Sequence, residues 1–113
     1  MKSLMTIDIA HPPMPGADAE TMLDESLRKI RLSHNLRILK IIHGYGSQGQ
    51  GGTLKTVTKN WIHKNQRRII SSIDGGDLSL MNPNVQVLLA ECDLSARKDF
   101  DVPNEGVTIV WVT

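Results

Sequence analysis

The chain has 113 residues, a formal net charge of +1 and 40% hydrophobic residues, a composition typical of one soluble globular domain. No apolar run approaches the roughly 20 residues that a membrane-spanning helix needs. The first residues do not form a secretory signal, because Asp8 interrupts a short apolar stretch. Cys92 is the single cysteine, which excludes an internal disulfide and a cysteine-built metal site. We therefore expect a cytoplasmic protein, and no membrane partner.

Strand and helix patterns alternate along the first half of the chain. Residues 4–10 are expected to form a short strand that ends at the prolines of "HPPMPG". Apolar residues at helical spacing predict a helix from Asp18, as N-cap, to about Ser33. Residues 36–42 are typical of a buried strand, and the apolar stripe that follows Thr53 predicts a helix with Thr53 as its N-cap.

The second half of the chain contains two further expected strands, at residues 67–73 and 106–112. Asn82 followed by Pro83 predicts the start of a short helix at 83–92. The order predicts an α/β fold: a two-layer sandwich with a four-stranded mixed sheet, two main helices and an extra segment at 74–104 before the last strand. We expect one domain over 1–113, with 1–3 as an N-terminal tail. Trp61, Trp111 and Cys92 are expected in the core.

Basic residues are concentrated in the middle of the chain. Between Ser26 and Ile73 there are ten Lys or Arg residues and no Asp or Glu. A positive surface attracts polyanions, so a nucleic-acid partner is favoured over a solvated basic face without a ligand. The ten residues are Arg28, Lys29, Arg31, Arg37, Lys40, Lys55, Lys59, Lys64, Arg67 and Arg68.

A glycine-rich stretch, "IIHGYGSQGQGG" at 41–52, lies inside this basic window, between a predicted strand and a predicted helix. The unpaired N–H groups at a helix N-terminus favour an anion there. A P-loop is excluded, because Gly52 stands where the motif needs Lys, although Thr53 fits the Ser or Thr position that follows. "GYGSQG" at 44–49 matches G-x-G-x-x-G, but the helix is expected three residues too late, and Asp74 lies too far along the chain for the ribose-binding acid. Nucleotide or small-anion binding remains a less favoured alternative.

The stretch "LRILKIIHGYG" at 36–46 resembles the Smr (small MutS-related) domain family, whose hallmark is an H-G-x-G loop between the second strand and the second helix. "TIDIAH" at 6–11 is similar to the Leu-Asp-Leu-His element of that family, and "EGVTIVWV" at 105–112 to its last strand. The resemblance implies nucleic-acid binding and, in many members, endonuclease nicking of DNA or RNA. It carries over Asp8, His43, Gly44 and Gly46. One departure concerns catalysis directly, because Ala10 occupies the histidine position and His11 follows one place later.

Three residues are therefore candidate catalytic groups for phosphodiester hydrolysis. His43 ends a strand beside the glycines, where an imidazole suits general acid–base chemistry. Asp8 could orient His43, recruit a divalent metal such as Mg²⁺, or accept N–H groups of the proline-rich turn. His11 follows in the same turn and, before two prolines, is favoured as a turn residue over a catalyst. No spacing of histidines and cysteines predicts a protein-built metal site. A nicking endonuclease and a non-catalytic nucleic-acid binder both remain open, as do DNA against RNA and self-association.

Contacts to nucleic acid are expected around the glycines. A backbone without Cβ atoms can approach phosphate closely, the side chain at the loop tip can stack on a base, and lysine or arginine can pair with phosphate. The expected contact residues are Gly44, Tyr45, Gly46, Arg37, Lys40, Lys55 and Lys59.

Overall fold

A computed structural model describes residues 2–45, 50–92 and 94–113, without the side chains of 50–52 and 94–96. Four strands, three α-helices and three 3₁₀ turns follow one another along the chain. In order they are β1 (Ser3–Asp8), α1 (Gly16–Leu32), β2 (Leu36–Ile42), α2 (Gln50–Lys64), η1 (Gln66–Arg68), β3 (Ile69–Asp74), η2 (Gly75–Asp77), α3 (Pro83–Glu91), η3 (Leu94–Asp99) and β4 (Val107–Val112).

The strands form one mixed sheet in the order β1-β2-β4-β3. β1 and β2 are parallel, and β4 is antiparallel to both β2 and β3. β1, β2 and β3 therefore point the same way, and their carboxyl ends lie along one edge of the sheet, which we call the strand-end edge. The predicted four-stranded mixed sheet is confirmed.

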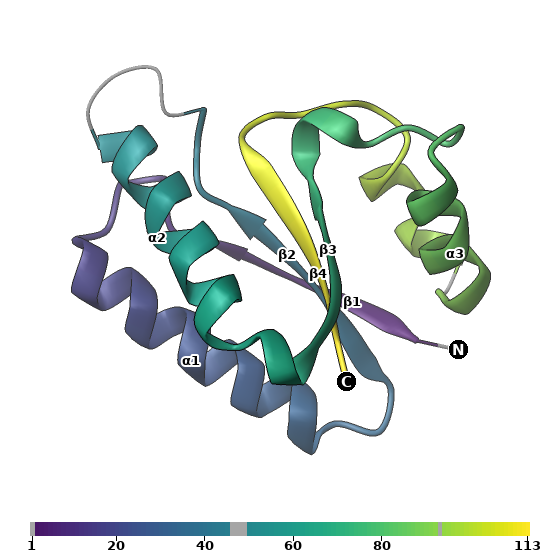
Figure 1. Ribbon diagram of the computed structural model, residues 1–113, viewed down its shortest axis with the longest axis horizontal. Coiled ribbons are helices and arrows are strands. Elements are labelled where there is room, and N and C mark those ends of the chain that lie inside the picture. The colour runs from purple at the N-terminus through teal and green to yellow at the C-terminus, as the bar shows by residue number, and fades with distance from the viewer. Residues whose placement is uncertain (1, 46–49, 93) are drawn as a thin grey trace.

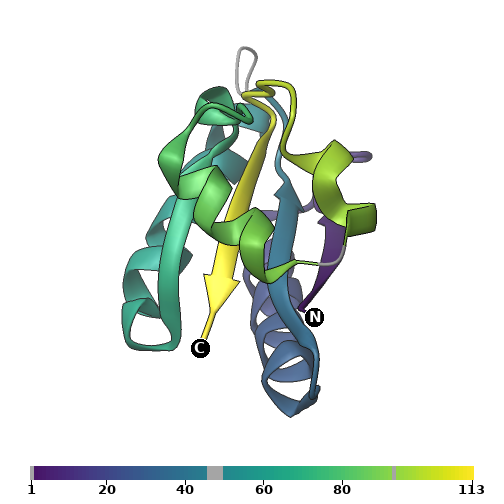
Figure 2. The ribbon, with the colours of Figure 1, turned by 90° about the vertical axis from the view of Figure 1, so that its right-hand side faces the viewer.

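Each face of the sheet has its own apolar core. On one face, α1 and α2 pack against Leu39, Ile41 and Val110, with Trp61 of α2 fully buried. On the other face, α3 and the segment around Phe100 cover Ile38 and Ile109. Figures 1 and 2 show the two helix groups on opposite sides of the strands. The α/β sandwich is confirmed, and the 74–104 segment adds a further layer against the second face.

Two helix starts differ from the sequence prediction. α1 begins at Gly16 after Pro15, so Asp18 lies in the first turn and makes no side-chain cap. α2 begins at Gln50, so Thr53 is inside the helix and is not its N-cap. The glycines at 51 and 52 are therefore helical, and the late helix start no longer counts against a dinucleotide fingerprint; the distant Asp74 and the small sheet still do.

The second half follows the prediction more closely. Asn82 caps α3 by accepting a hydrogen bond from Asn84 N–H, and Pro83 is the first helical residue. Cys92 is buried, as predicted, whereas Trp111 is half-buried against the second core. The third strand starts later than predicted, because Arg67 and Arg68 belong to η1. Among the described residues, no helix is both long and apolar enough to cross a membrane.

Candidate nucleic-acid interface

Polar residues that the sequence predicted at the ends of strands lie together along the strand-end edge. Asp8 pairs with Ile42 in the parallel register of β1 and β2, so Asp8 and His43 end neighbouring strands. Asp74, the last residue of β3, pairs with Thr108 near the start of β4. Four chemistry-bearing side chains thus share one edge, as parallel strands require.

His43 is fully buried at this edge, with 0% of its surface exposed. Its Nδ1 lies 2.8 Å from the carbonyl oxygen of Gly44, and its Nε2 lies 2.8 Å from Oγ1 of Thr108. A carbonyl can only accept, so Nδ1 carries the hydrogen and Nε2 accepts from the Thr108 hydroxyl. Both ring nitrogens therefore have protein partners, which makes His43 a poor candidate for the general acid or base.

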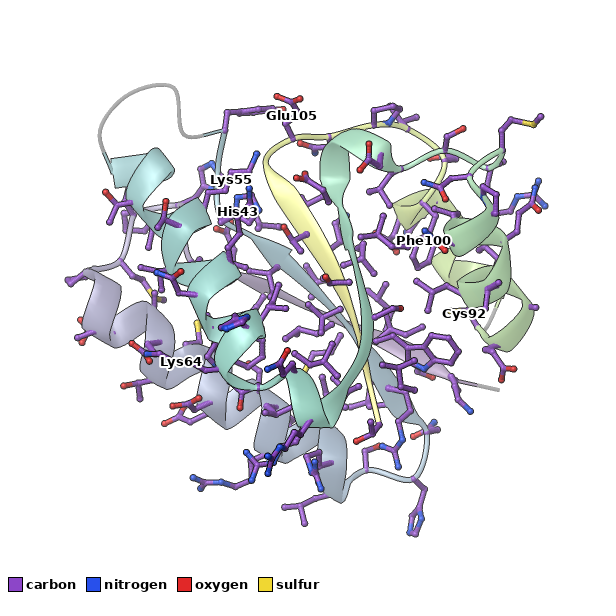
Figure 3. All side chains as sticks on the ribbon, viewed as in Figure 1. His43, Lys55, Lys64, Cys92, Phe100 and Glu105 are labelled. Carbon is purple, nitrogen blue, oxygen red and sulfur yellow. The ribbon has the colours of Figure 1, made fainter. Side chains whose placement is uncertain are left out.

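The electrostatic surroundings also keep His43 neutral. Burial lowers the pKa of His43 below its ordinary value, and the positive charge of Lys55 lowers it further. The hydrogen bond to Gly44 and the negative charge of Asp74 oppose this shift without reversing it. Figure 3 shows His43 and Lys55 close together between the first turns of α2 and the sheet. The ring is a neutral, buried connector in this structure.

The backbone after His43 is held to the start of β4. The N–H groups of His43 and Gly44 both donate to the carbonyl of Gly106, at 2.9 and 3.1 Å. Gly44 has a φ of 82°, a conformation that a residue with a Cβ adopts only at a cost. Tyr45 follows with 67% of its surface exposed, so it is accessible for stacking. Gly46, a predicted phosphate contact, lies outside the described residues.

Asp8 and His11 form an exposed pair at the end of β1. Nδ1 of His11 lies 3.0 Å from Oδ2 of Asp8, and Asp8 also accepts hydrogen bonds from the N–H groups of Ala10 and His11. Desolvation raises the pKa of Asp8, but these hydrogen bonds and the His11 charge outweigh it and lower the pKa below its ordinary value. The His11 side chain is 68% exposed, and its Nε2 is the nitrogen that does not face the carboxylate.

Asp8 therefore orients His11, whereas the sequence pattern allowed Asp8 to orient His43 or to recruit a metal. The chain turns tightly after β1, where Ala10 and Pro13 form an isolated bridge. His11 lies within this turn, and its Nδ1 is 3.1 Å from Oδ1 of Asp8. No group of three or more His, Cys, Asp or Glu side chains that could hold a metal ion occurs in the described parts of the chain.

Two predicted contact residues are engaged within the protein. Nη1 of Arg37 donates to the carbonyl oxygens of Ile30, Ser33 and Leu36, so this side chain holds the end of α1 and the following turn. Nζ of Lys40 lies 2.9 Å from Oδ1 of Asp99 in a half-buried ion pair. Lys40 projects to the face covered by α3 and η3, away from α2.

Lys59 lines a groove between α2 and the edge strand β3. The groove has a volume of about 320 Å³ and is also bordered by Ile62, His63, Gln66, Ser72, Asp74 and Thr108. Lys55 lies one turn earlier on α2, beside His43. We call this the α2–β3 groove.

Arginines gather at the opposite end of the helix layer. Arg28, Arg31 and Arg68 line a groove of about 610 Å³ between the last turns of α1 and the segment after α2. Of the four basic residues expected to contact nucleic acid around the glycines, Lys55 and Lys59 lie on α2, whereas Arg37 holds the end of α1 and Lys40 lies on the other face. The basic residues of the helix layer extend instead from Lys55 along the helices to these arginines.

Comparison with known proteins identifies the family to which this fold belongs. The Smr domain family matches residues 13–76, more than half of the chain, so the chain belongs to the Smr domain family. The span includes His43 and Lys55 but not Asp8 or His11.

A solved structure has the same fold. The Smr domain of Thermus thermophilus MutS2 superposes with a TM-score of 0.57 at 18% identity, and the alignment covers 100% of this chain and 99% of that one. No curated protein sequence matches the chain significantly. The structural similarity thus supports the assignment of the fold, and the family match supports membership in the Smr domain family.

Sequence reasoning missed the role of Thr108 and underrated Asp74. Thr108 stands in a strand of apolar residues, where a single hydroxyl facing the helix layer signals a buried polar partner. Asp74 was considered only as a ribose-binding acid. Its position at the carboxyl end of a strand parallel to β1 and β2 could have placed it at the same edge.

Proposed function

We propose that this Smr domain binds nucleic acid along the exposed side of its helix layer. The surface concerned, which we call the basic helical surface, consists of Arg28, Arg31, Lys55, Lys59, Arg67 and Arg68. The single observation that carries the proposal is the groove in which Arg28, Arg31 and Arg68 converge from two separate segments. Arginine suits such a site, because its planar guanidinium binds phosphate through two hydrogen bonds.

The dimensions of the surface suit a polymer of phosphates. α2 has 15 residues and is therefore about 22 Å long. Along the axis of a B-form duplex the phosphates of one strand repeat at about 3.4 Å, so a duplex that follows α2 would present about six phosphates of each strand. Lysines and arginines at both ends of this helix fit a polyanion better than a single small anion.

The opposite face is less suited to the same partner. Two of its described cations lie beside acids: Lys40 pairs with Asp99, and Lys98 lines a pocket together with Asp99 and Asp101. By contrast, no ion pair is recorded for the members of the basic helical surface among the described residues. One acid, Asp24, also lines the arginine groove, so the contrast between the two faces lies in the ion pair of Lys40, which the members of the basic helical surface lack in the described part of the chain.

Binding to single-stranded and double-stranded oligonucleotides at increasing salt tests this function. Affinity is expected to fall steeply, with a logarithmic slope of about 0.7 per phosphate contact for single strands and about 0.9 for duplexes. The double variant Arg31→Glu, Arg68→Glu should weaken binding and flatten the slope. The double variant Arg97→Glu, Lys98→Glu, an equal total charge change on exposed η3, is the matched control. Equal effects of both changes, or binding that ignores salt, would refute the proposal.

A second candidate function, phosphodiester cleavage, is favoured by the exposed Asp8–His11 pair. Asp8 accepts the Nδ1 hydrogen of His11, which leaves Nε2 to take a proton from an attacking water or ribose hydroxyl. This arrangement of an orienting carboxylate and an accessible imidazole is a recurring one in general-base catalysis. His43 would serve as a positioning residue beneath the edge.

Incubation with supercoiled plasmid and structured RNA, with and without Mg²⁺, tests cleavage. The wild-type protein is expected to nick one of these substrates, and His11→Ala is expected to abolish nicking while the fold and the binding remain. A protein that binds but never nicks is the non-catalytic binder. Nicking that survives His11→Ala would assign the chemistry to another group.

A further inference from the structure

The α2–β3 groove separates hydrogen-bond acceptors from donors. The strands contribute Ser72, Asp74 and Thr108, which form its floor, and α2 and η1 contribute Lys59, His63 and Gln66, which form its rim. Ile62 adds an apolar wall. At about 320 Å³, the groove is at the lower end of the range of small-molecule sites, about 300–1,000 Å³.

Hydrogen bonding elsewhere determines what the floor can offer. Because Nδ1 of His43 donates to Gly44, the hydrogen of the Thr108 hydroxyl is committed to Nε2 of His43. Toward a ligand, Thr108 can therefore only accept. The Asp74 carboxylate accepts from Gly76 N–H through Oδ1, and no partner of its other oxygen is recorded in the described part of the chain. Asp74 and Thr108 are thus the two groups of the floor that can only accept, whereas the hydroxyl of Ser72, which also lines the groove, can donate or accept.

The rim has the opposite character. Lys59 and His63 are exposed residues one turn apart on α2, and Gln66 follows in η1. Their side chains can donate to an anion at the mouth of the groove. A ligand that fits has a hydrogen-bond donor at its inner end and a negative charge at its outer end.

We propose that the α2–β3 groove binds one nucleotide unit of a single-stranded nucleic acid and prefers a base with an exocyclic amino group. The amino group would donate to Asp74 and Thr108, the base would lie against Ile62, and the phosphate would meet Lys59 and His63. Cytosine, adenine and guanine carry such an amino group, whereas uracil presents a carbonyl in the corresponding position. This inference rests on the proposed nucleic-acid binding and deepens it.

The site is open along the helix, so the strand can continue. Lys55 lies one turn toward the strand-end edge, and Arg67 and Arg68 follow Gln66 directly. The neighbouring phosphates would then meet the basic helical surface at both ends of the groove. This continuity favours a nucleotide within a strand as the occupant.

Three oligonucleotides whose pyrimidine bases differ in the group at C4 provide the test. Affinities for oligo(dC) and oligo(dU) of equal length are measured at pH 8, with oligo(N4,N4-dimethyl-dC) as a third ligand that lacks the amino hydrogens. The wild-type protein is expected to bind oligo(dC) about 5- to 10-fold more tightly than either of the others, the discrimination that one well-placed base contact provides.

The variant Asp74→Asn replaces an acceptor of the floor with a group of the same shape that can also donate a hydrogen bond. Its amide can still accept from Gly76 N–H but can now donate to the uracil carbonyl, so the preference for oligo(dC) should shrink to about 2-fold or less. Arg97→Ala on η3 is the control and should leave the preference unchanged. The dimethylated ligand tests the proposal with the wild-type protein alone.

The outcomes separate the two proposals. Equal affinity for all three ligands, or an unaltered preference in Asp74→Asn, would overturn the groove assignment while nucleic-acid binding stands. Absence of binding to every oligonucleotide, at low salt, would overturn both.

Discussion

The ends of β1 and β2 are neighbours in the sheet, and each is followed by a histidine, yet the two histidines differ in almost every respect. His43, in the family's glycine motif, is fully buried with both ring nitrogens hydrogen-bonded. His11, displaced by one place from the family's motif, is exposed and oriented by Asp8. His43 thus has a structural role, although it lies in the family's motif, whereas His11 has the accessible ring nitrogen.

Replacement of the two histidines should give the largest contrast. His43→Ala removes a buried ring and leaves Thr108 and the Gly44 carbonyl without their partner, so we expect a loss of about 3–5 kcal/mol in the free energy of unfolding. His11→Ala should cost under about 1 kcal/mol, because the pair is exposed. Chemical denaturation measures both. Similar losses would contradict the assignment of His43 to a structural role.

The hydroxyl of Thr108 provides a finer probe of the same connector. Thr108→Val keeps the shape but leaves Nε2 of His43 as a buried acceptor without a donor, so we expect a loss of about 1–3 kcal/mol. Thr6→Val is the matched control on exposed β1 and should change stability by less than about 0.5 kcal/mol. A neutral Thr108→Val would mean that the hydrogen bond contributes nothing to stability.

Acid should weaken the protein through His43. The pKa of His43 is lowered in the folded state, so between its folded value and about 6.5 the unfolded chain binds the extra proton. Stability from this group is complete above about pH 6.5 and falls as the pH decreases toward the folded pKa, by at most about 1.4 kcal/mol per pH unit. Unfolding midpoints between pH 8 and pH 5 show the effect, and His43→Gln should remove it. Asp8, whose pKa is also lowered, contributes only in a separate window below about pH 4.

Lys40 and Lys59 are expected to differ in the same way, one stabilising the fold and the other binding nucleic acid, with smaller effects. Lys40→Met breaks the half-buried pair with Asp99 and should cost about 1 kcal/mol in stability, with little change in nucleic-acid binding. Lys59→Met should leave stability within about 0.5 kcal/mol and weaken binding. Denaturation and fluorescence anisotropy on the same two proteins provide the comparison. A Lys40→Met variant that loses more affinity than Lys59→Met would place the ligand on the other face.

Much of the fold was predictable because the spacing of apolar residues agrees with the residues that start and end each element. The apolar run of β2 and the Asn82–Pro83 start of α3 are local signals, and both lie where the sequence placed them. The start of α2 was misplaced because glycines normally end helices, and here Gly51 and Gly52 are inside one.

The site was harder to predict, because it depends on contacts between distant segments. Whether a strand-end histidine is exposed depends on what covers it, and the partner of His43 is a threonine 65 residues away. The direction of Lys40 depends on strand register, and the role of Arg37 on the position of the α1 carboxyl end. The stretch from Ser26 to Ile73 is rich in Lys and Arg, but in the folded protein these residues lie on two different faces.

An NMR titration of ¹⁵N-labelled protein with single-stranded oligonucleotide tests the central claim most directly. The account predicts that amide shifts concentrate in α2, η1 and the last turns of α1, that the His11 ring responds, and that the His43 ring remains neutral with hydrogen on Nδ1. Shifts that concentrate in α3 and η3, or a His43 ring that is charged at pH 7, would contradict it.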